Sequence, residues 1–310
     1  MIRYLAITGG VGGAKLGLGL ARILKGSELA FVVNTGDDFE HLGWHISPDI
    51  DTLTYTLSEL ANPVLGWGRE DETWSFMETL EEFGGESWFR LGDRDLALHT
   101  LRSEMLRNGA TLTQATAHIT TQLGIEHRIY PMSDQPVRTT VNTVEGPLAF
   151  QHYFVRDRCR PSVTGFEFVG IADAQLNPKL EGLLDSLDAI IICPSNPFVS
   201  VDPLLKIPGV RQALKASPAP VIAVSPIVGG KAIKGPTAKM MRELNVPATA
   251  AEVAGHYGDL LDGFVLDEQD AALHNTLAIP TVVAQTVMVS LQDRIDLAQA
   301  TLDFAHTLNR

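Results

Sequence analysis

The chain is poor in several features that would mark a specialised class of protein. Its 310 residues include only two cysteines, Cys159 and Cys193, which are too few and too far apart for a disulfide framework or a CxxC metal site. Basic residues are also scarce: 24 Lys and Arg stand against 37 Asp and Glu, and the formal net charge of -13 repels phosphate backbones. We therefore expect a cytoplasmic protein that does not bind nucleic acid.

Long apolar runs are also lacking. The first apolar stretch reaches glycine within ten residues, and no segment approaches the roughly 20 apolar residues that a membrane helix needs. We expect no secretory signal and no membrane anchor. The composition is 45% hydrophobic and 20% charged, which excludes disordered and low-complexity classes and is typical of a globular protein.

The order of apolar segments is typical of an open α/β sheet. Residues 4–8 and 31–34 have strand character, and leucines at helical spacing lie between them at 14–24. A crossover this short implies parallel neighbouring strands with a right-handed connection. Further strand-like segments lie at 189–193, 220–224, 264–266 and 281–284, before a last helix at about 291–308. The sequence predicts an α/β fold with a doubly wound, Rossmann-like, mainly parallel sheet.

The segment between about residues 61 and 165 differs from the rest of the chain in its periodicity and composition. It has helical periodicity at 73–83, 94–107 and 113–123, and β-rich composition at 128–130, 137–143 and 148–155. No linker or internal repeat separates it from the rest. We expect one composite domain over residues 1–310. Its nucleotide-binding core would span about 1–60 and 166–310, with a mixed helical and β cap inserted at about 61–165 over one face of the sheet.

A glycine-rich turn follows the first strand. At this place, free backbone N–H groups and the helix dipole favour a phosphate. The turn does not match a P-loop, because Leu16 lacks the required hydroxyl, nor GxGxxG, because Lys15 stands at the third glycine. The alternative is a turn that only lets strand and helix pack closely. The candidate phosphate-binding residues are Gly10, Val11, Gly12, Gly13 and Lys15.

Four carboxylates follow the second strand, and they are Asp37, Asp38, Asp49 and Asp51. Like charges beside a phosphate site repel one another and the ligand unless a cation is present, so the cluster indicates a divalent metal, most naturally Mg²⁺. Two alternatives stay open. Asp37 could bind a ribose hydroxyl, as in nicotinamide enzymes, or Asp51 could cap a helix that begins near Thr52.

Two later strand ends carry small polar residues. The first runs from Pro194 to Ser200, where two prolines fix a loop whose side chains can bind a base or a ribose. The second runs from Ser225 to Lys231. Strand ends that converge on one crevice are where open α/β sheets bind ligands.

Other polar patterns are less specific. His41 and His45 have the spacing of a helical zinc pair, but Gly43 between them and the lack of an adjacent Glu argue against it. The segments 67–74 and 91–96 mix aromatic, arginine and carboxylate side chains in expected loops. Such mixtures are equally typical of solvated surface ion pairs.

Taken together, the motifs resemble the 2-phospho-L-lactate transferases of coenzyme F420 biosynthesis. The segments that carry the resemblance span nearly the whole chain, and they are ITGGVGGAKL, VNTGDDFEHLGWHISPDIDT, WGREDETW, LGDRDLALH, PMSDQPVRTTV, ICPSNPFVSVDP and SPIVGGKAIKGP. The resemblance implies that the terminal alcohol of the deazaflavin Fo (7,8-didemethyl-8-hydroxy-5-deazariboflavin) attacks the distal phosphorus of a guanosine diphosphate-linked acid. GMP then leaves, and the phospho-acid is joined to the deazaflavin.

The resemblance also implies roles for individual residues. Mg²⁺ would be held by Asp37 and Asp49, less favourably by Asp38 and Asp51, with Lys15 as a further catalytic residue beside the diphosphate. The remaining nucleotide-binding residues would be Ser195, Asn196, Pro197, Gly229 and Lys231. The deazaflavin would contact Trp67, Arg69, Trp74, Asp93 and Arg94. A general base is not assigned, because any nearby aspartate could accept the alcohol's proton late in the transfer.

Two other classes remain as alternatives: a nonenzymatic nucleotide-sugar-binding regulator of the same superfamily, and a nicotinamide-dependent dehydrogenase. The acid on the donor is left open among phospholactate, phosphoenolpyruvate and phosphoglycerate. A homodimer is the default expectation for the oligomeric state.

Overall fold

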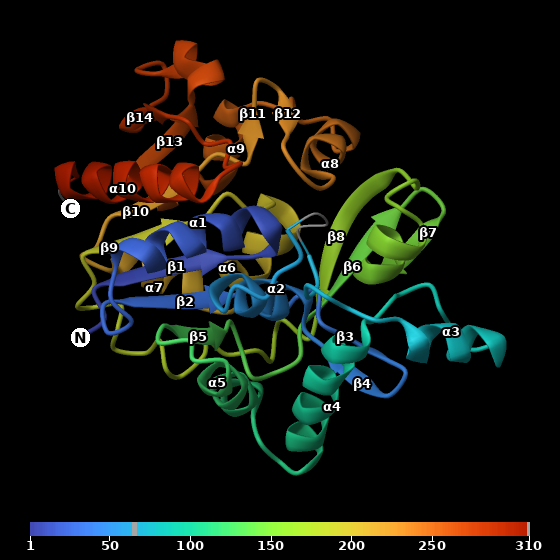
Figure 1. The fold of residues 1–310 in the computed structure, drawn as a ribbon. Coiled ribbons are helices and arrows are strands. Elements are labelled where there is room, and N and C mark those ends of the chain that lie inside the picture. The colour runs from blue at the N-terminus through green and yellow to red at the C-terminus, as the bar shows by residue number, and fades with distance from the viewer. Residues whose placement is uncertain (64–66, 309–310) are drawn as a thin grey trace.

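The computed structural model describes residues 1–63 and 67–308. Its centre is a seven-stranded sheet in the order β14-β13-β10-β9-β1-β2-β5, with every neighbouring pair parallel (Figure 1). The strands are β1 (Tyr4–Thr8), β2 (Leu29–Val33), β5 (Arg128–Pro131), β9 (Ala189–Ile192), β10 (Val221–Val224), β13 (Gly263–Asp267) and β14 (Thr281–Ala284). The predicted doubly wound, parallel α/β sheet is confirmed.

Helices cover both faces of this sheet because each central strand is apolar on both sides. One face packs against α1 (Gly10–Ile23), α2 (Pro48–Leu57), α5 (Leu112–Gln122) and α10 (Leu291–Thr307). The other packs against α6 (Asp202–Leu205), α7 (Val210–Ala216), α8 (Thr237–Glu243) and α9 (Ala250–Tyr257). Alternate residues of β1 divide between the two cores, with Leu5 and Ile7 in one and Tyr4 and Ala6 in the other.

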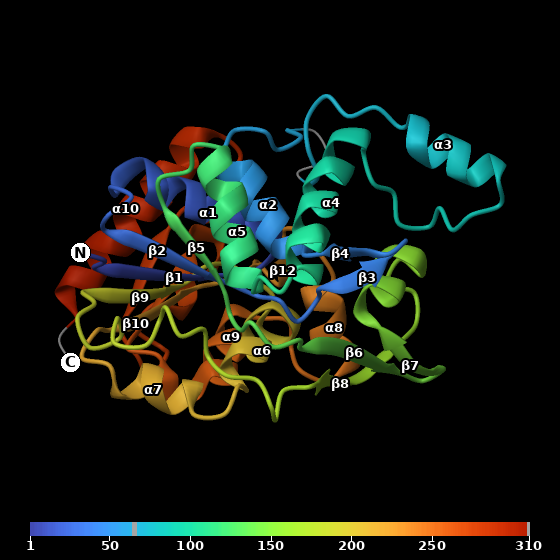
Figure 2. The same cartoon turned by 90° about the horizontal axis from the view of Figure 1, so that it is seen from below.

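Residues 61–165 divide between the sheet and the cap. Strand β5 pairs in parallel with β2 and forms an edge of the central sheet, so this part of the expected insertion belongs to the core. The cap sheet is antiparallel in the order β7-β6-β8, and its strands are β6 (Arg138–Thr143), β7 (Gly146–Ala149) and β8 (Val163–Val169). Helix α3 (Ser75–Glu82) extends away from the core, whereas α4 (Asp93–Arg107) packs against α5 (Figure 2).

Three local expectations were wrong. The glycine turn is the start of helix α1, which begins at Gly10. Helix α2 begins at Pro48, so Asp51 lies inside its first turn and cannot be its N-cap. The second half of the 148–155 segment is a π-helical turn (His152–Arg156) that follows β7.

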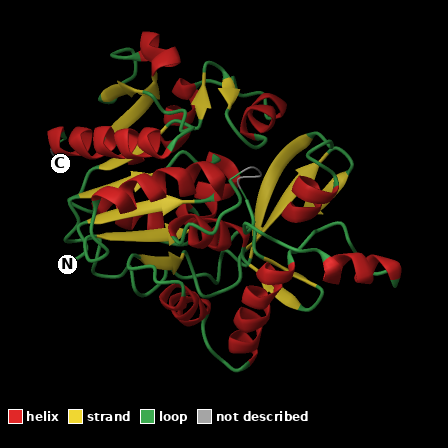
Figure 3. Ribbon diagram, in the orientation of Figure 1, coloured by secondary structure: helices red, strands yellow, loops and turns green. Residues whose placement is uncertain are grey.

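Short elements complete the chain (Figure 3). Two small hairpins are β3 (Phe39–His41) with β4 (Trp44–Ile46), and β11 (Ile227–Val228) with β12 (Lys231–Ala232). A π-helical turn (Pro197–Val201) and two 3₁₀ turns (Gly258–Leu260 and Glu268–Leu273) link other elements. No helix in the described ranges combines the length and apolarity needed to cross a lipid bilayer.

Candidate active site

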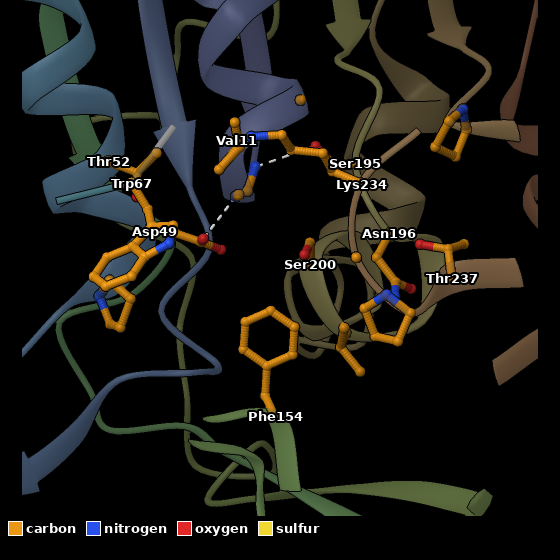
Figure 4. A pocket seen from close by; sticks show the side chains of 18 of the residues that line it. Val11, Asp49, Thr52, Trp67, Phe154, Ser195, Asn196, Ser200, Lys234 and Thr237 are labelled. Carbon is orange, nitrogen blue, oxygen red and sulfur yellow. Dashed lines mark hydrogen bonds between the residues drawn. The ribbon is translucent and has the colours of Figure 1, made fainter. Parts of the chain in front are cut away.

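A cavity of about 460 Å³ opens at the carboxyl ends of the central strands (Figure 4). The chain leaves β1, β9 and β10 into its wall, as expected for an open parallel sheet. The cavity brings together predicted residues that are far apart in sequence. Its lining includes Gly10, Val11, Gly12, Lys15, Asp37, Asp49, Trp67, Ser195 and Asn196.

The turn at the start of α1 is held by two side chains from other elements. The Gly9 amide donates to Ser195 Oγ at 3.2 Å, and the Gly10 amide donates to Asp49 Oδ1 at 2.6 Å. Gly10 has φ of +70°, which favours glycine, and a methyl group at Gly12 would lie 2.5 Å from the Pro194 carbonyl oxygen. The turn therefore both packs closely and faces the cavity, whereas Gly13 packs against Thr8 outside the lining.

The structure separates the four carboxylates into two pairs. Asp38 accepts a hydrogen bond of 2.8 Å from Ser47 Oγ and lies 3.1 Å from His45 Nε2. Asp51 forms a bidentate ion pair with Arg102. Both are thus committed to partners within the protein, and neither lines the cavity.

Asp37 and Asp49 form the other pair, and both face the cavity. Asn34 Nδ2 donates to Asp37 Oδ1 at 3.2 Å and to Asp49 Oδ2 at 2.9 Å. Burial and the neighbouring Asp49 carboxylate raise the pKa of Asp37 well above its usual value. Burial raises the pKa of Asp49 to about 6, although hydrogen bonds from Asn34 and Gly10 oppose the shift. The two buried carboxylates thus share one neutral donor, Asn34, and in the described chain neither has a salt-bridge partner.

This pair fits a magnesium ion. Mg²⁺ is usually bound by one or two carboxylates, with substrate phosphates and waters completing the octahedron. Within residues 1–63 and 67–308 no group of three or more His, Cys, Asp and Glu is arranged around one point. Burial is the main cause of both raised pKa values, and a dication would offset it by favouring the charged carboxylates.

Positive charge gathers on another part of the wall. Lys15 Nζ donates to the Met288 carbonyl oxygen at 2.7 Å. Burial lowers the Lys15 pKa, and the nearby Arg294 and Lys234 lower it further. Lys234 also lines the cavity, and sequence analysis missed it although it lies in a quoted motif. A cationic wall in the same cavity as a carboxylate pair suits a ligand whose phosphates are bridged by a metal.

The polar loops at later strand ends contribute unequally. Ser195 and Asn196 line the cavity, whereas Pro197 begins a π-helical turn behind them. Gly229 has its amide engaged by Asp270 Oδ2 at 3.0 Å, and Lys231 is exposed on β12; both are outside the lining. Ser200 and Ser225 also line the cavity, and they lie in the two polar segments that the sequence indicates without being named as site residues. Sequence analysis missed the polar lining residues Thr237 and Thr286, neither of which directly follows a strand.

Of the predicted acceptor residues, Trp67 alone is in the lining, with an exposed fraction of 50%. Trp74 lies outside it, beneath the Arg90 guanidinium at 4.6 Å from the ring centroid. Arg69 forms an isolated β-bridge with Ala61, and Arg94 is exposed. The aromatic residues that do face the cavity besides Trp67 are Phe89, Phe150 and Phe154.

The remaining acceptor candidate, Asp93, holds a helix end. Its carboxylate accepts hydrogen bonds of 3.1 Å from the Ser75 and Phe76 amides at the start of α3. Glu72 does the reverse, accepting from the Arg94 and Asp95 amides at the start of α4 at 2.8 and 2.9 Å. The WGREDETW and LGDRDLALH motifs thus cap each other's helices.

A second cavity of about 380 Å³ adjoins the first and shares Asp37, Phe150 and Gln151 with it. Gln151 Nε2 donates to the Asp37 carbonyl oxygen at 3.2 Å. His41 lines this second cavity, on hairpin β3–β4 rather than on a helix. His45 lies across the hairpin and beside Asp38, so the two histidines do not form a helical zinc pair.

Comparisons with known proteins identify the family of this chain. The family model described as 2-phospho-L-lactate transferase CofD matches residues 5–298. A 2-phospho-L-lactate transferase of Methanosarcina mazei is 38% identical over 298 residues, covering 95% of this chain and 98% of that protein. A phosphoenolpyruvate transferase of Kitasatospora aureofaciens is 37% identical over 313 residues, covering 99% and 96%.

Among solved structures, a UPF0052 family member from Bacillus halodurans has the same fold. Its TM-score is 0.64 at 15% identity, and the match covers 97% of this chain and 99% of that one. At that identity the likeness concerns the fold alone. The family match and the relatives lead to one conclusion: the chain belongs to the CofD family of 2-phospho-L-lactate transferases.

Proposed function

We propose that the protein is a magnesium-dependent transferase of coenzyme F420 biosynthesis. It joins the phospho-acid of a guanosine diphosphate-linked donor to the terminal hydroxyl of Fo and releases GMP. The observation that carries the proposal is the pair Asp37 and Asp49, two buried carboxylates without a salt bridge in the described chain, facing a nucleotide-sized cavity beside the glycine turn. Family membership makes a phosphoryl-type transfer the expected use of that pair.

The donor's diphosphate fits between the carboxylates and the cationic wall. Attack at phosphorus requires mainly that the reactants be held in line and that charge on the phosphate oxygens be neutralised. When bound, Mg²⁺ supplies that neutralisation at Asp37 and Asp49. Lys15 and Lys234 contribute positive charge from the wall of the same cavity, and the guanosine extends past Ser195 and Asn196 towards Thr237.

The acceptor approaches from the cap. Trp67, Phe150 and Phe154 present aromatic surface to the cavity, which suits a flat deazaflavin ring. Gln151, hydrogen-bonded to the Asp37 backbone, lies where the two cavities meet and can orient the terminal hydroxyl. Asp37 and Asp49 both face the cavity, so either carboxylate can accept the alcohol's proton late in the transfer.

Product analysis tests the proposal. Purified protein is incubated with Fo, Mg²⁺ and, in separate reactions, guanosine diphosphate-linked phospholactate, phosphoenolpyruvate or 3-phosphoglycerate. Mass spectrometry should find one F420-type product together with GMP, and the preferred acid identifies the donor. If no reaction releases GMP but a nucleotide-sugar raises the melting temperature, the chain is a binding regulator instead. Stabilisation by a nicotinamide dinucleotide alone would indicate the dehydrogenase alternative.

A further inference from the structure

A buried ionic network joins α4 of the cap to α2 of the core. Arg102 has an exposed fraction of 1% and donates through Nη1 to Asp51 Oδ2 at 3.0 Å and through Nη2 to Asp51 Oδ1. His99 Nδ1 lies 3.8 Å from Asp51 Oδ2, and His99 Nε2 lies 3.1 Å from Asp95 Oδ2. The Tyr55 hydroxyl donates to Asp95.

The spacing of these residues makes the contact continuous along both helices. Asp95, His99 and Arg102 are four and three residues apart, which places them on one face of α4. Asp51 and Tyr55 are four apart on α2. The two helices are therefore fixed in register as well as in distance.

Stability does not explain this network well. Taking an Arg and an Asp out of water costs several kcal/mol per ion, and apolar residues of similar size often fill such a place equally well or better. An apolar contact, however, lets two helices slide, whereas a bidentate Arg–carboxylate pair accepts one geometry. The network thus fixes position more effectively than it adds free energy.

The helix that it fixes carries a cavity carboxylate. Asp49 and Asp51 both lie in the first turn of α2. Asp51 points to Arg102, while Asp49 is aimed at the Gly10 amide, which is only 2.6 Å from Oδ1. A small rotation or slide of α2 would change that contact and the spacing between Asp49 and Asp37.

We propose that Arg102 is a positioning residue: through Asp51 it holds the first turn of α2 so that Asp49 and Asp37 can bind one metal ion together. Arg102 touches neither cavity, so it acts through α2. It also neutralises Asp51, which leaves Asp37 and Asp49 as the pair available to the cation. The inference rests on the metal site of the proposed function and extends it to a residue of the cap.

The test compares metal binding in three variants with the wild type. Arg102→Lys keeps the charge but loses the bidentate geometry. The double variant Asp51→Leu/Arg102→Met replaces the pair with apolar side chains, so no charge is left buried alone and the protein is expected to fold. Val210→Ala shortens a buried side chain on α7, on the opposite face of the sheet, and controls for general loss of stability.

Binding is measured with Mn²⁺ by electron paramagnetic resonance in the presence of GDP, and amide hydrogen exchange reports on residues 48–57. We expect the double variant to bind Mn²⁺ about 10- to 100-fold more weakly, as when residues that orient metal ligands are replaced. Arg102→Lys should show a smaller loss. Exchange in α2 should accelerate in both, while Val210→Ala keeps wild-type Mn²⁺ affinity despite a lower melting temperature.

Wild-type Mn²⁺ affinity in the folded double variant would overturn the positioning role. An equal loss of affinity in Val210→Ala would also overturn it, because general destabilisation would then suffice. Wild-type protein that binds Mn²⁺ with GDP but transfers nothing to Fo contradicts the proposed function and leaves the positioning role standing. Wild-type protein that binds no Mn²⁺ contradicts both.

Discussion

Asp49 accepts the Gly10 backbone amide at 2.6 Å, so a carboxylate from α2 occupies a donor that the glycine turn would otherwise offer to a phosphate. This contact joins the expected metal site and the expected phosphate turn into one unit. A metal ion that draws Asp49 towards Asp37 competes with the Gly10 amide for the same carboxylate. Metal and nucleotide are therefore expected to bind cooperatively.

The first prediction concerns stability without metal. The pKa of Asp37 is higher in the folded protein than in the unfolded chain. Protonated Asp37 therefore contributes to folding stability below about pH 4, and this contribution is lost as the pH rises through the pKa that Asp37 has in the folded protein. Asp37→Asn removes the charge and should raise the melting temperature at pH 8 in EDTA, by about 2–4 °C for each kcal/mol of relieved repulsion. Thermal scans of the wild type and Asp37→Asn from pH 4 to 8 check this. The prediction is contradicted if the melting temperature of Asp37→Asn exceeds that of the wild type by more at pH 4 than at pH 8.

The second prediction concerns turnover. Asp37→Asn and Asp49→Asn each remove a charge that the metal requires, and kcat should fall on the order of a thousandfold or more. The measurement is the initial rate against Mg²⁺ concentration, with EDTA-treated wild type as a reference. Asp303→Asn, an exposed aspartate on α10, should turn over normally. A near-normal rate of the EDTA-treated wild type would contradict the metal site and would indicate a structural role for Asp37 and Asp49.

Much of the architecture could be predicted from the sequence because it is encoded locally. The strands of the central sheet are short apolar runs, and their alternation with helices indicates a parallel sheet. The sequence predicts strand β5 to belong to the cap, which is wrong, because nothing in its four residues, Arg128–Pro131, indicates that they pair with β2. Pairing at a sheet edge is a long-range contact that composition does not report.

The carboxylate cluster shows the same limit at the site. The sequence places four aspartates at one sheet edge, but it cannot assign partners to them. The structure sorts them through residues far along the chain: Arg102 takes Asp51, and His45 takes Asp38, which leaves Asp37 and Asp49 facing the cavity. Similarly, the sequence places WGREDETW and LGDRDLALH in separate loops. The structure brings them together, because Asp93 caps α3 and Glu72 caps α4.

The third prediction is a preference for guanine over adenine. Asn196 lines the cavity; its Oδ1 accepts the Phe198 amide, and its Nδ2 lies 3.3 Å from Met240 Sδ, a weak acceptor. The Nδ2 donor can therefore turn to the carbonyl oxygen of guanine, where adenine carries an amino group. GDP should bind at least about tenfold more tightly than ADP, roughly 1.4 kcal/mol.

Calorimetry with Mg²⁺ and each nucleotide measures that ratio. Asn196→Asp keeps the size and the acceptor for Phe198 but removes the amide donor, so it should reduce the discrimination. Equal affinity of the wild type for GDP and ADP would remove guanosine from the proposed donor.

The fourth prediction concerns the exchange of helix caps between Glu72 and Asp93. Asp93→Ala leaves the Ser75 and Phe76 amides without their acceptor, so hydrogen exchange in α3 should accelerate. Glu72→Ala should do the same in the first turn of α4. GDP affinity should stay unchanged in both, because neither side chain lines the cavity. Unchanged exchange in α3 and α4 would contradict the capping role.

The last prediction separates the aromatic residues that face the acceptor from those that support the cap. Trp67 lines the cavity, so Trp67→Ala should raise the KM for Fo roughly two- to tenfold, the loss of an aromatic contact of about 0.5–1.5 kcal/mol, while the KM for the donor changes little. Trp74 is covered by Arg90 and Arg94 is exposed, so Trp74→Ala and Arg94→Ala should leave the KM for Fo near the wild-type value. Trp74→Ala should instead lower the melting temperature, because it removes the ring on which Arg90 packs.

Steady-state kinetics with both substrates varied checks all three variants. If Trp74→Ala or Arg94→Ala raises the KM for Fo more than Trp67→Ala does, the acceptor lies along the exposed side of the cap, and the cavity holds the donor alone.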